Sequence, residues 1–248
     1  MIGLHYSYQS FDTVSPGTNK VLAEHSCLVI SNLCLSDRLT VPILLQLDAL
    51  QNLLNLAQTS TDSLQEASLQ ALYQLVRTEK LSQEESRLLV ASSVKLLTPP
   101  RESPPIHLLW ILYILSSDQS LHNHLANRSF LHQCMDIATY EIFQKCDSRP
   151  LVKLLTPVVR ILANLSAGPD SVAVCLSLVR HPDFPAILTA LLTTNYTHLC
   201  RESLWLFANI VNNENVTVQE EFVNLDLMDK LESHAVHAVS RLDPFAFG

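Results

Sequence analysis

The sequence predicts an all-α protein built from repeated helical units. Apolar residues recur at helical spacing along most of the chain, and the longest apolar helices recur at similar intervals. The chain contains only 4 glycines, where roughly 17 are expected at the usual frequency of about 7%. This shortage disfavours folds that need many tight turns, because glycine is the residue that adopts a left-handed backbone without strain.

Composition and charge restrict the classes of function. With 48% apolar residues among 248, the chain can bury a core. The net charge of −8 provides no basic excess to displace counterions from phosphates, so a basic peptide is a more suitable partner than nucleic acid. The six cysteines form no C-x-x-C pair, and most stand in apolar contexts typical of buried free thiols. Since the N-terminus has no secretory signal, a reducing cytosolic or nuclear setting is expected.

The order of the elements follows from periodicity and from turn residues. Residues 1–19 lack periodicity and are expected to form a loose leader, followed by a repeat region over residues 20–240 and a short tail over residues 241–248. The proline-rich stretch 98–105 is expected to be an exposed connector within the repeat region. The expected helices cover residues 21–33, 40–47, 49–57, 63–76, 82–97, 107–115, 120–125, 130–145, 151–165, 171–179, 184–193, 201–213, 217–224 and 227–239.

Local signals justify several of these boundaries. Asp48 stands between two expected helices and suits a turn, because aspartate tolerates a left-handed backbone. A serine followed three places later by glutamate, the spacing of a capping box, begins at Ser63 and again at Ser82. Gly168, followed by proline, is expected to end the preceding helix as a C-terminal glycine.

The longest apolar run, residues 106–115, is about half the roughly 20 residues that a bilayer crossing needs. His107 lies within this run, and two prolines precede it directly. We therefore expect a buried helix of the repeat region and no membrane association.

The helices recur in threes: a short one, a medium one, and a long apolar one. Aligning the ends of the long helices at Asn32, Gln74, Ile114, Asn164 and Asn209 gives intervals of 42, 40, 50 and 45 residues. A period of about 40 to 47 residues with two or three helices is the signature of armadillo and HEAT arrays, whose units must stack to bury their apolar faces. The prediction is a right-handed armadillo/HEAT-type superhelical solenoid of about five partial or whole repeats, with the long third helices lining a concave groove.

One of the third helices carries a more specific pattern. The residues R-E-S-L-W-x-x-x-N, from Arg201 to Asn209, resemble the third helix of an importin-alpha-type armadillo repeat, whose pattern reads Lys/Arg-Glu-Ala-x-Trp-x-x-x-Asn. The following segment, EEFVNLDLMDKL, is similar to the next two helices of that family, with Asp226 where glycine is usual. The armadillo resemblance covers residues 21 to about 240, and the groove motif is complete only once.

The resemblance implies a peptide-binding role for three residues. In importin-alpha, rows of tryptophan and asparagine hold an extended basic peptide, the nuclear localisation signal, along the groove. Trp205 would form an aromatic wall against lysine stems, Asn209 would contact the peptide backbone, and Glu202 would pair with a lysine ammonium. The alternative is that Trp205 is a core residue and that Asn209 bonds to the neighbouring repeat.

The other third helices depart from the family pattern. Asn32 and Asn164 match the groove asparagine, but Leu28 and Arg160 stand where tryptophan is expected. An arginine in the groove would repel a lysine-rich ligand. Asn32 and Asn164 are candidate peptide contacts, with a structural bond between adjacent third helices as the alternative. Trp110 matches the groove tryptophan, but Ile114 stands where the asparagine is expected. We interpret Trp110 as a residue of the core.

Catalytic and metal-binding motifs are not evident. The sequence has no G-x-x-x-x-G-K-[ST], G-x-G-x-x-G, H-E-x-x-H or G-x-S-x-G pattern, so neither an enzyme, a cofactor nor a small-molecule substrate is expected. The one metal-like group is His122, His124, His132 and Cys134, with donors that would suit zinc. Because the first two histidines would point in different directions from one helix, we interpret the group as solvated surface histidines and expect no metal.

These observations predict a non-enzymatic armadillo-repeat adaptor that resembles importin-alpha. It would bind extended basic peptides of the nuclear localisation signal type for protein import into the nucleus, and would be found in cytoplasm and nucleus. The basic arm by which importin-alpha binds importin-beta is not recognised in this chain. The alternative is a general armadillo protein-protein interaction scaffold with a non-basic ligand.

Overall fold

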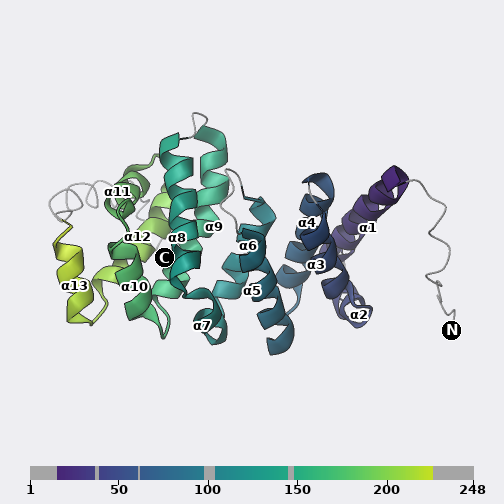
Figure 1. The fold of residues 1–248 in the computed structure, drawn as a ribbon, viewed down its shortest axis with the longest axis horizontal. Helices are drawn as coiled ribbons and strands as arrows, with labels where there is room; N and C mark the ends of the chain where they lie inside the picture. The colour runs from purple at the N-terminus through teal and green to yellow at the C-terminus, as the bar shows by residue number, and fades with distance from the viewer. Residues whose placement is uncertain (1–15, 37–38, 61, 98–103, 145–147, 226–248) are drawn as a thin grey trace. The chain divides into compact units, whose positions relative to one another are not determined.

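The computed structural model describes residues 16–36, 39–60, 62–97, 104–144 and 148–225. Within these ranges the regular elements are all helices, which confirms the predicted all-α class (Figure 1). The expected helix over 227–239 and the tail over 241–248 lie outside the described residues. The helices are α1 (Pro16–Ser36), α2 (Thr40–Gln46), α3 (Ala49–Thr59), α4 (Asp62–Thr78), α5 (Gln83–Leu97), α6 (Ile106–Ser116), η1 (Gln119–Leu121), α7 (His122–Leu125), α8 (Arg128–Thr139), η2 (Tyr140–Gln144), α9 (Ser148–Ser166), α10 (Ser171–Val179), α11 (Phe184–Thr193), α12 (Thr197–Val211) and α13 (Val216–Val223).

The described helices form two compact units, divided in the sequence between Lys80 and Leu81. The sequence indicated one repeat region without such a division. In the first unit, α1 packs along α4, and α3 also packs on α4. Five of the six apolar residues of α3 recur at helical spacing and are buried: Ala49, Leu50, Leu53, Leu54 and Ala57. This spacing places them on the face that meets α4.

Asp48 forms the turn between α2 and α3. Its φ of 56° and ψ of 25° are left-handed, as predicted, and it is the only non-glycine residue with positive φ in the described ranges. Its carbonyl accepts a hydrogen bond from the Asn52 amide at 3.0 Å. The same residue therefore reverses the chain and begins the next helix.

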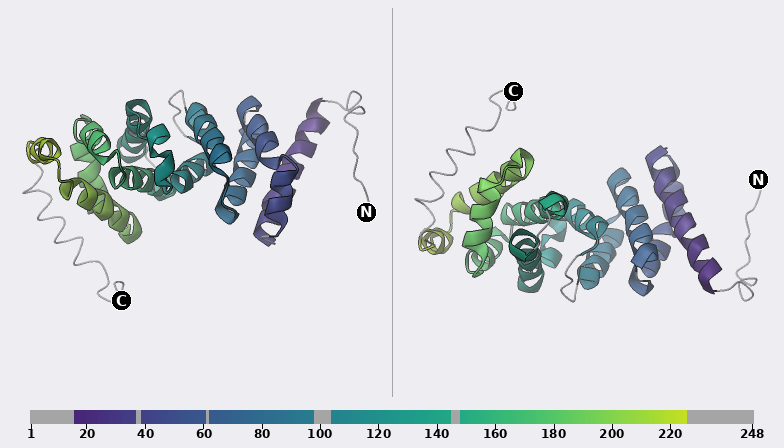
Figure 2. Two further views of the ribbon diagram at one scale, coloured as in Figure 1. Left: turned by 90° about the horizontal axis from the view of Figure 1, so that it is seen from below. Right: turned by 90° about the horizontal axis from the view of Figure 1, so that it is seen from above.

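In the second unit, α6, α9 and α12 lie side by side in that order, because α6 packs on α9 and α9 packs on α12. The helices α8, α10 and α13 pack on one another in sequence, and both α8 and α10 also contact α9. Figures 1 and 2 show these helices following one another through the unit, from teal to yellow. Residues on the accessible side of α6, α9 and α12 therefore form one surface.

The helix α9 is buried around most of its circumference. From residue 154 to residue 166, all side chains are buried except Arg160 and Asn164, which are partly exposed. A helix that is apolar on nearly every side is typical of a position between other helices. Its two accessible polar residues are four positions apart, so they share the face that contributes to the surface.

The expected capping boxes have different outcomes. The Ser82 hydroxyl donates to the Glu85 carboxylate at 2.6 Å, the Ser82 amide donates to it at 2.8 Å, and the Glu85 amide donates back to the Ser82 hydroxyl at 3.3 Å. This capping box is confirmed. The one expected at Ser63 is wrong, because α4 begins at Asp62 and the Ser63 hydroxyl donates to Glu24 of α1.

The three largest differences from the predicted boundaries are in α1, α8 and α12. The helix α1 begins at Pro16, inside the expected leader, because proline suits a first helical turn whose N–H groups have no partner. The single helix expected over 130–145 is instead an α-helix that ends at Thr139 and continues as the π-helix η2. The helix α12 begins at Thr197, four residues before the expected start, because Leu199 is buried on its inner face.

The apolar run of α6 is part of the core of the second unit. Six of its 11 residues are buried: Leu108, Leu109, Ile111, Leu112, Leu115 and Ser116. This confirms the expected buried helix. In the part of the chain that the structure describes, no helix has the length and apolar character needed to cross a membrane.

Gly168 does not have the left-handed backbone expected of a helix-ending glycine, since none of the described glycines has a positive φ. Glycine suits this position because there is no space for a side chain. A Cβ atom at Gly168 would lie 1.9 Å from Nδ1 of His122, far inside van der Waals contact. His122 is only 2% exposed, and its Nε2 donates to the Ser116 carbonyl at 2.8 Å. The backbone of Gly168 therefore covers a fixed, buried imidazole.

Candidate functional site

One stripe of α12 carries His198, Glu202, Trp205 and Asn209. Their spacing of four, three and four residues places them on one face of a helix. The opposite face is buried in the second unit and consists of Leu199, Cys200, Ser203, Leu206 and Ile210. The apolar periodicity of α12 therefore directs the predicted groove residues away from the core.

Trp205 is 42% exposed, so the interpretation of this residue as a core tryptophan is wrong. Asn209 is partly buried, and its Nδ2 donates to the Ala163 carbonyl of α9 at 2.9 Å. Because a carbonyl only accepts, this bond fixes the orientation of the amide and leaves Oδ1 as an acceptor. The pair thus combines an accessible indole with an asparagine that also bonds the neighbouring helix.

Asn164 makes the corresponding bond one helix earlier. Its Nδ2 donates to the hydroxyl of Ser116 in α6 at 2.8 Å. Asn164 therefore makes a structural bond to a neighbouring helix, while the assignment of α6 and α9 as third helices of repeats stays a prediction. Together with Asn209, it joins α6 to α9 and α9 to α12 through side-chain amides.

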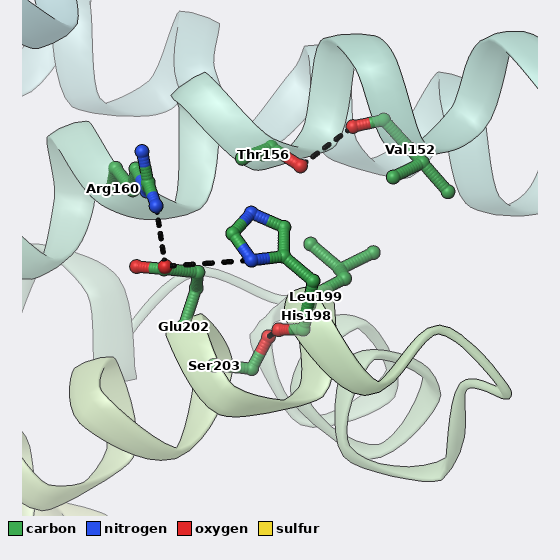
Figure 3. Close-up of polar contacts among 7 residues, drawn as sticks. All are labelled: Val152, Thr156, Arg160, His198, Leu199, Glu202 and Ser203. Atoms are coloured by element: carbon green, nitrogen blue, oxygen red, sulfur yellow. Dashed lines mark hydrogen bonds and ion pairs between the residues drawn. The ribbon is translucent and has the colours of Figure 1, made fainter. Parts of the chain in front are cut away.

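Glu202 has a partner within the protein. Its Oε1 accepts a hydrogen bond from Nη2 of Arg160 at 2.7 Å, and Nδ1 of His198 lies 3.9 Å from the same oxygen. Figure 3 shows the carboxylate of Glu202 between the Arg160 guanidinium and the His198 ring. The side chains of Arg160 and Glu202 are 23% and 13% exposed. The contact of Glu202 with a ligand ammonium stays a prediction, and such a ligand would have to share the carboxylate with Arg160.

Arg160 extends this contact to α6. Its Cζ atom lies 5.1 Å from the centroid of the Tyr113 ring, a cation–π distance, and the Tyr113 ring meets the Trp110 ring edge-on at 5.7 Å. The hydrogen bond to Glu202 raises the pKa of Arg160 above its ordinary value. Trp110 and Tyr113 are partly exposed, so the surface continues across three helices.

We expect the Arg160–Glu202 pair to contribute measurably to stability. In a double-mutant cycle with Arg160→Met and Glu202→Gln, we predict a coupling of about 1 kcal/mol, because both charges are largely shielded from water. Urea unfolding followed by circular dichroism measures each variant. The control pair, Arg180 with Glu221, also has an N–O distance of 2.7 Å but is 54% and 38% exposed, so it should couple more weakly. Equal coupling in the two pairs would contradict the prediction.

A polar hollow lies where α9 and α12 end. Its volume is about 490 Å³, and its lining includes Ser166, Asn209, Asn212 and Glu214. None of its lining residues is basic. Asn209 therefore belongs to both features, the stripe on α12 and this hollow.

Some of the polar groups around the hollow are used within the fold. Asn213 Nδ2 donates to the Ser171 hydroxyl at 3.4 Å, and Asn215 Oδ1 accepts from the first amides of α13. Glu214 is exposed and has no ion-pair partner among the described residues. Its carboxylate and Asn209 Oδ1 remain available as acceptors, which suits a donor-rich cation such as a lysine ammonium.

The structure brings four of the five predicted site residues together on α9 and α12: Asn164, Glu202, Trp205 and Asn209. The fifth, Asn32, is exposed on α1 of the first unit. Its role as a peptide contact stays a prediction.

The histidine and cysteine cluster differs from the expected solvated surface group. His122 is 2% exposed and Cys134 is fully buried. In the described ranges, no three histidine, cysteine or acidic side chains gather in a group that could hold a metal ion. The described cysteines, Cys27, Cys34, Cys134, Cys175 and Cys200, are buried free thiols, which confirms their expected role as small apolar residues.

Sequence reasoning did not find Tyr113, the Arg160–Glu202 pair or Glu214. One signal for the pair was present, because Arg160 and Glu202 have opposite charge and are 42 residues apart, the same interval that separates Asn32 and Gln74 in the alignment of the long helices. A search for complementary residues one interval apart would have found it. The hollow had no such signal, because the end of α9 and the loop after α12 meet only in the folded chain.

Comparison with known proteins supports the fold without identifying a family. No family model matches the sequence, and no curated protein matches it. The structure is similar to an engineered protein whose crystal structure was determined by the Northeast Structural Genomics Consortium, with a TM-score of 0.57 and 15% sequence identity. The match covers 90% of this chain and 94% of the engineered one. At this identity the similarity concerns the fold alone.

Proposed function

We propose that this chain is a non-enzymatic adaptor with an armadillo-type solenoid fold, and that the surface of α6, α9 and α12 binds an extended peptide. The hydrogen bonds between these consecutive helices support a repeat architecture. They join residues that are 42, 46 and 48 positions apart, close to the intervals between the long apolar helices. A right-handed array of about five partial or whole repeats would explain this regular offset.

The observation that carries the peptide-binding proposal is the exposed indole of Trp205. A large aromatic side chain that is 42% exposed beside an asparagine can pack the aliphatic part of a ligand side chain. The neighbouring acceptors, Asn209 Oδ1 and the Glu214 carboxylate, favour a lysine or arginine side chain at this point. The proposed ligand is therefore a basic peptide.

A basic ligand agrees with the importin-alpha resemblance of α12. The biological role that we propose on that basis is recognition of nuclear localisation signals during protein import, with the protein present in cytoplasm and nucleus. Glu214 would then supply the carboxylate for the ligand, while Glu202 stays paired with Arg160.

The Arg160–Glu202 pair favours a second candidate. Arg160 carries a positive charge on the surface and neutralises the nearest carboxylate. A general interaction scaffold for an acidic or apolar peptide would meet less repulsion there than a lysine-rich ligand would. The two candidates differ in the charge of the ligand.

Fluorescence anisotropy with three labelled peptides tests the proposal: a lysine-rich peptide, the same peptide with alanine at each lysine, and an acidic peptide with apolar residues. We expect saturable binding of the lysine-rich peptide alone. Glu214→Gln should weaken this binding about fivefold, because it removes one exposed charge contact. Glu220→Gln, at an exposed position of α13, is the matched control and should have no effect. Preferred binding of the acidic peptide would support the scaffold instead, and binding of none of the three would overturn the peptide-binding proposal.

A further inference from the structure

A second hollow lies between α8 and α10, and it shares no lining residue with the polar hollow beside Asn209. Its volume is about 330 Å³, and its polar lining consists of Arg128, His132, Ser177 and Arg180. No carboxylate lines it. In a chain with a net charge of −8, two arginines around one hollow are a local reversal of charge.

Arg128 retains most of its hydrogen-bonding capacity. Its Nε donates to Nε2 of His132 at 3.4 Å, and no carboxylate pairs with its guanidinium among the described residues. The side chain is exposed, at the first position of α8. The other N–H groups of its guanidinium are therefore free to donate to a ligand.

Arg180 approaches from the other helix. Its Nε and Nη2 both donate to a single oxygen of Glu221, at 3.1 and 2.7 Å. This pair is mostly exposed, and exposed pairs contribute little, so Arg180 can turn towards a ligand at small cost. An anion between the helices would then receive donors from both guanidinium groups.

The remaining polar groups agree with an anion site. The hydroxyl of Ser177 is shielded from solvent and has no hydrogen-bond partner in the described part of the chain. A hydroxyl can rotate to donate to an anion. The ring of His132 is packed edge-on against the ring of His181, with centroids 5.0 Å apart, and an Asp136 carboxylate oxygen lies 3.9 Å from Nε2 of His181. Asp136 is not among the residues that line the hollow.

We infer that this hollow between α8 and α10 binds a phosphate monoester presented by a phosphorylated serine or threonine of a protein partner. Two guanidinium forks and a hydroxyl match the three terminal oxygens of a phosphate monoester dianion better than the two oxygens of a carboxylate. The hollow opens to the protein surface, where Arg128 and Arg180 are exposed, so a side chain of another protein can enter it. This site is independent of the peptide surface on α6, α9 and α12.

Isothermal titration calorimetry with the full chain tests this inference. The probes are a short glycine-alanine peptide with one phosphoserine, the same peptide with serine, and inorganic phosphate alone. We expect the phosphopeptide to bind saturably and the serine peptide not to bind. Inorganic phosphate should compete with the phosphopeptide but bind more weakly, because it lacks the peptide contacts. Equal binding of the two peptides, or binding of inorganic phosphate without the phosphopeptide, would overturn the inference.

Variants locate the binding. Arg128→Gln should weaken phosphopeptide binding at least tenfold, and Arg180→Gln should also weaken it. Arg87→Gln, an exposed arginine of α5 with no part in the hollow, is the matched control and should leave binding unchanged. Because Arg128 is exposed, its variant should keep the thermal unfolding midpoint of the parent, which separates a binding effect from misfolding. Unchanged affinity in both Arg128→Gln and Arg180→Gln would overturn the assignment of the site.

Discussion

Trp205→Ala should weaken binding of a lysine-rich peptide about thirtyfold, equivalent to about 2 kcal/mol, the loss typical of an aromatic residue at the centre of an interface. The indole provides the large apolar face of the surface, and alanine leaves nothing for lysine stems to pack against. Because Trp205 is 42% exposed, the free energy of unfolding should change much less than the binding free energy. Anisotropy titration measures the affinity, and urea unfolding measures the stability.

Leu88→Ala is the control for this variant. Leu88 lies on α5 and is also 42% exposed, so it tests whether loss of any exposed apolar side chain lowers affinity. It should leave peptide affinity unchanged. Trp205 is a better test than Asn209, because replacing Asn209 would also remove the hydrogen bond to Ala163 and disturb the packing of α12 on α9. An affinity for Trp205→Ala equal to that of the parent would contradict the assigned surface.

Gly168→Ala should destabilise the second unit by about 3 kcal/mol, at the upper end of the usual cost of overpacking a core. The added methyl would lie 1.9 Å from Nδ1 of His122, and this imidazole is buried and held by the Ser116 carbonyl. Either the ring must leave its hydrogen bond or the backbone after α9 must move. Urea or thermal unfolding followed by circular dichroism measures the loss.

A double-mutant cycle separates the clash from other effects of Gly168→Ala. His122→Ala is destabilising by itself, because it leaves a cavity and an unpaired carbonyl. In that background the methyl of Gly168→Ala enters vacant space, so its cost should fall well below the value in the parent. Ala167→Ser, at the exposed neighbouring position, should change stability by less than about 0.5 kcal/mol. Equal costs of Gly168→Ala in both backgrounds would show that contact with His122 is not the cause.

The fold class and most helices could be predicted because they depend on local pattern. The ranges 171–179 and 184–193 agree with α10 and α11, and Asp48 has the left-handed backbone that its position indicated. The reason for Gly168 could not be predicted, because the residue that it contacts, His122, is 46 positions away in the sequence. The division between Lys80 and Leu81 had no local signal either, since no glycine or proline stands there.

The candidate site was only partly predictable, for a related reason. The spacing of Trp205 and Asn209 indicates a shared helix face, and the structure confirms that this face is accessible at Trp205. What each polar group bonds to depends on the neighbouring helix. The partner of Glu202 is Arg160 on α9, and the partner of Asn209 is the carbonyl of Ala163 on the same helix. Sequence pattern supplies the residues of a surface, while packing decides which of their donors and acceptors stay free.

The two tryptophans of the chain, Trp110 and Trp205, both lie on helices of the proposed surface. Their indole N–H signals in a ¹H–¹⁵N NMR spectrum therefore test peptide binding directly, with Trp110→Phe and Trp205→Phe to assign them. During titration with the lysine-rich peptide, the Trp205 signal should shift and saturate at the concentration where anisotropy saturates, and the alanine-substituted peptide should cause no shift. Saturable binding that leaves the Trp205 signal unmoved would contradict the proposed surface.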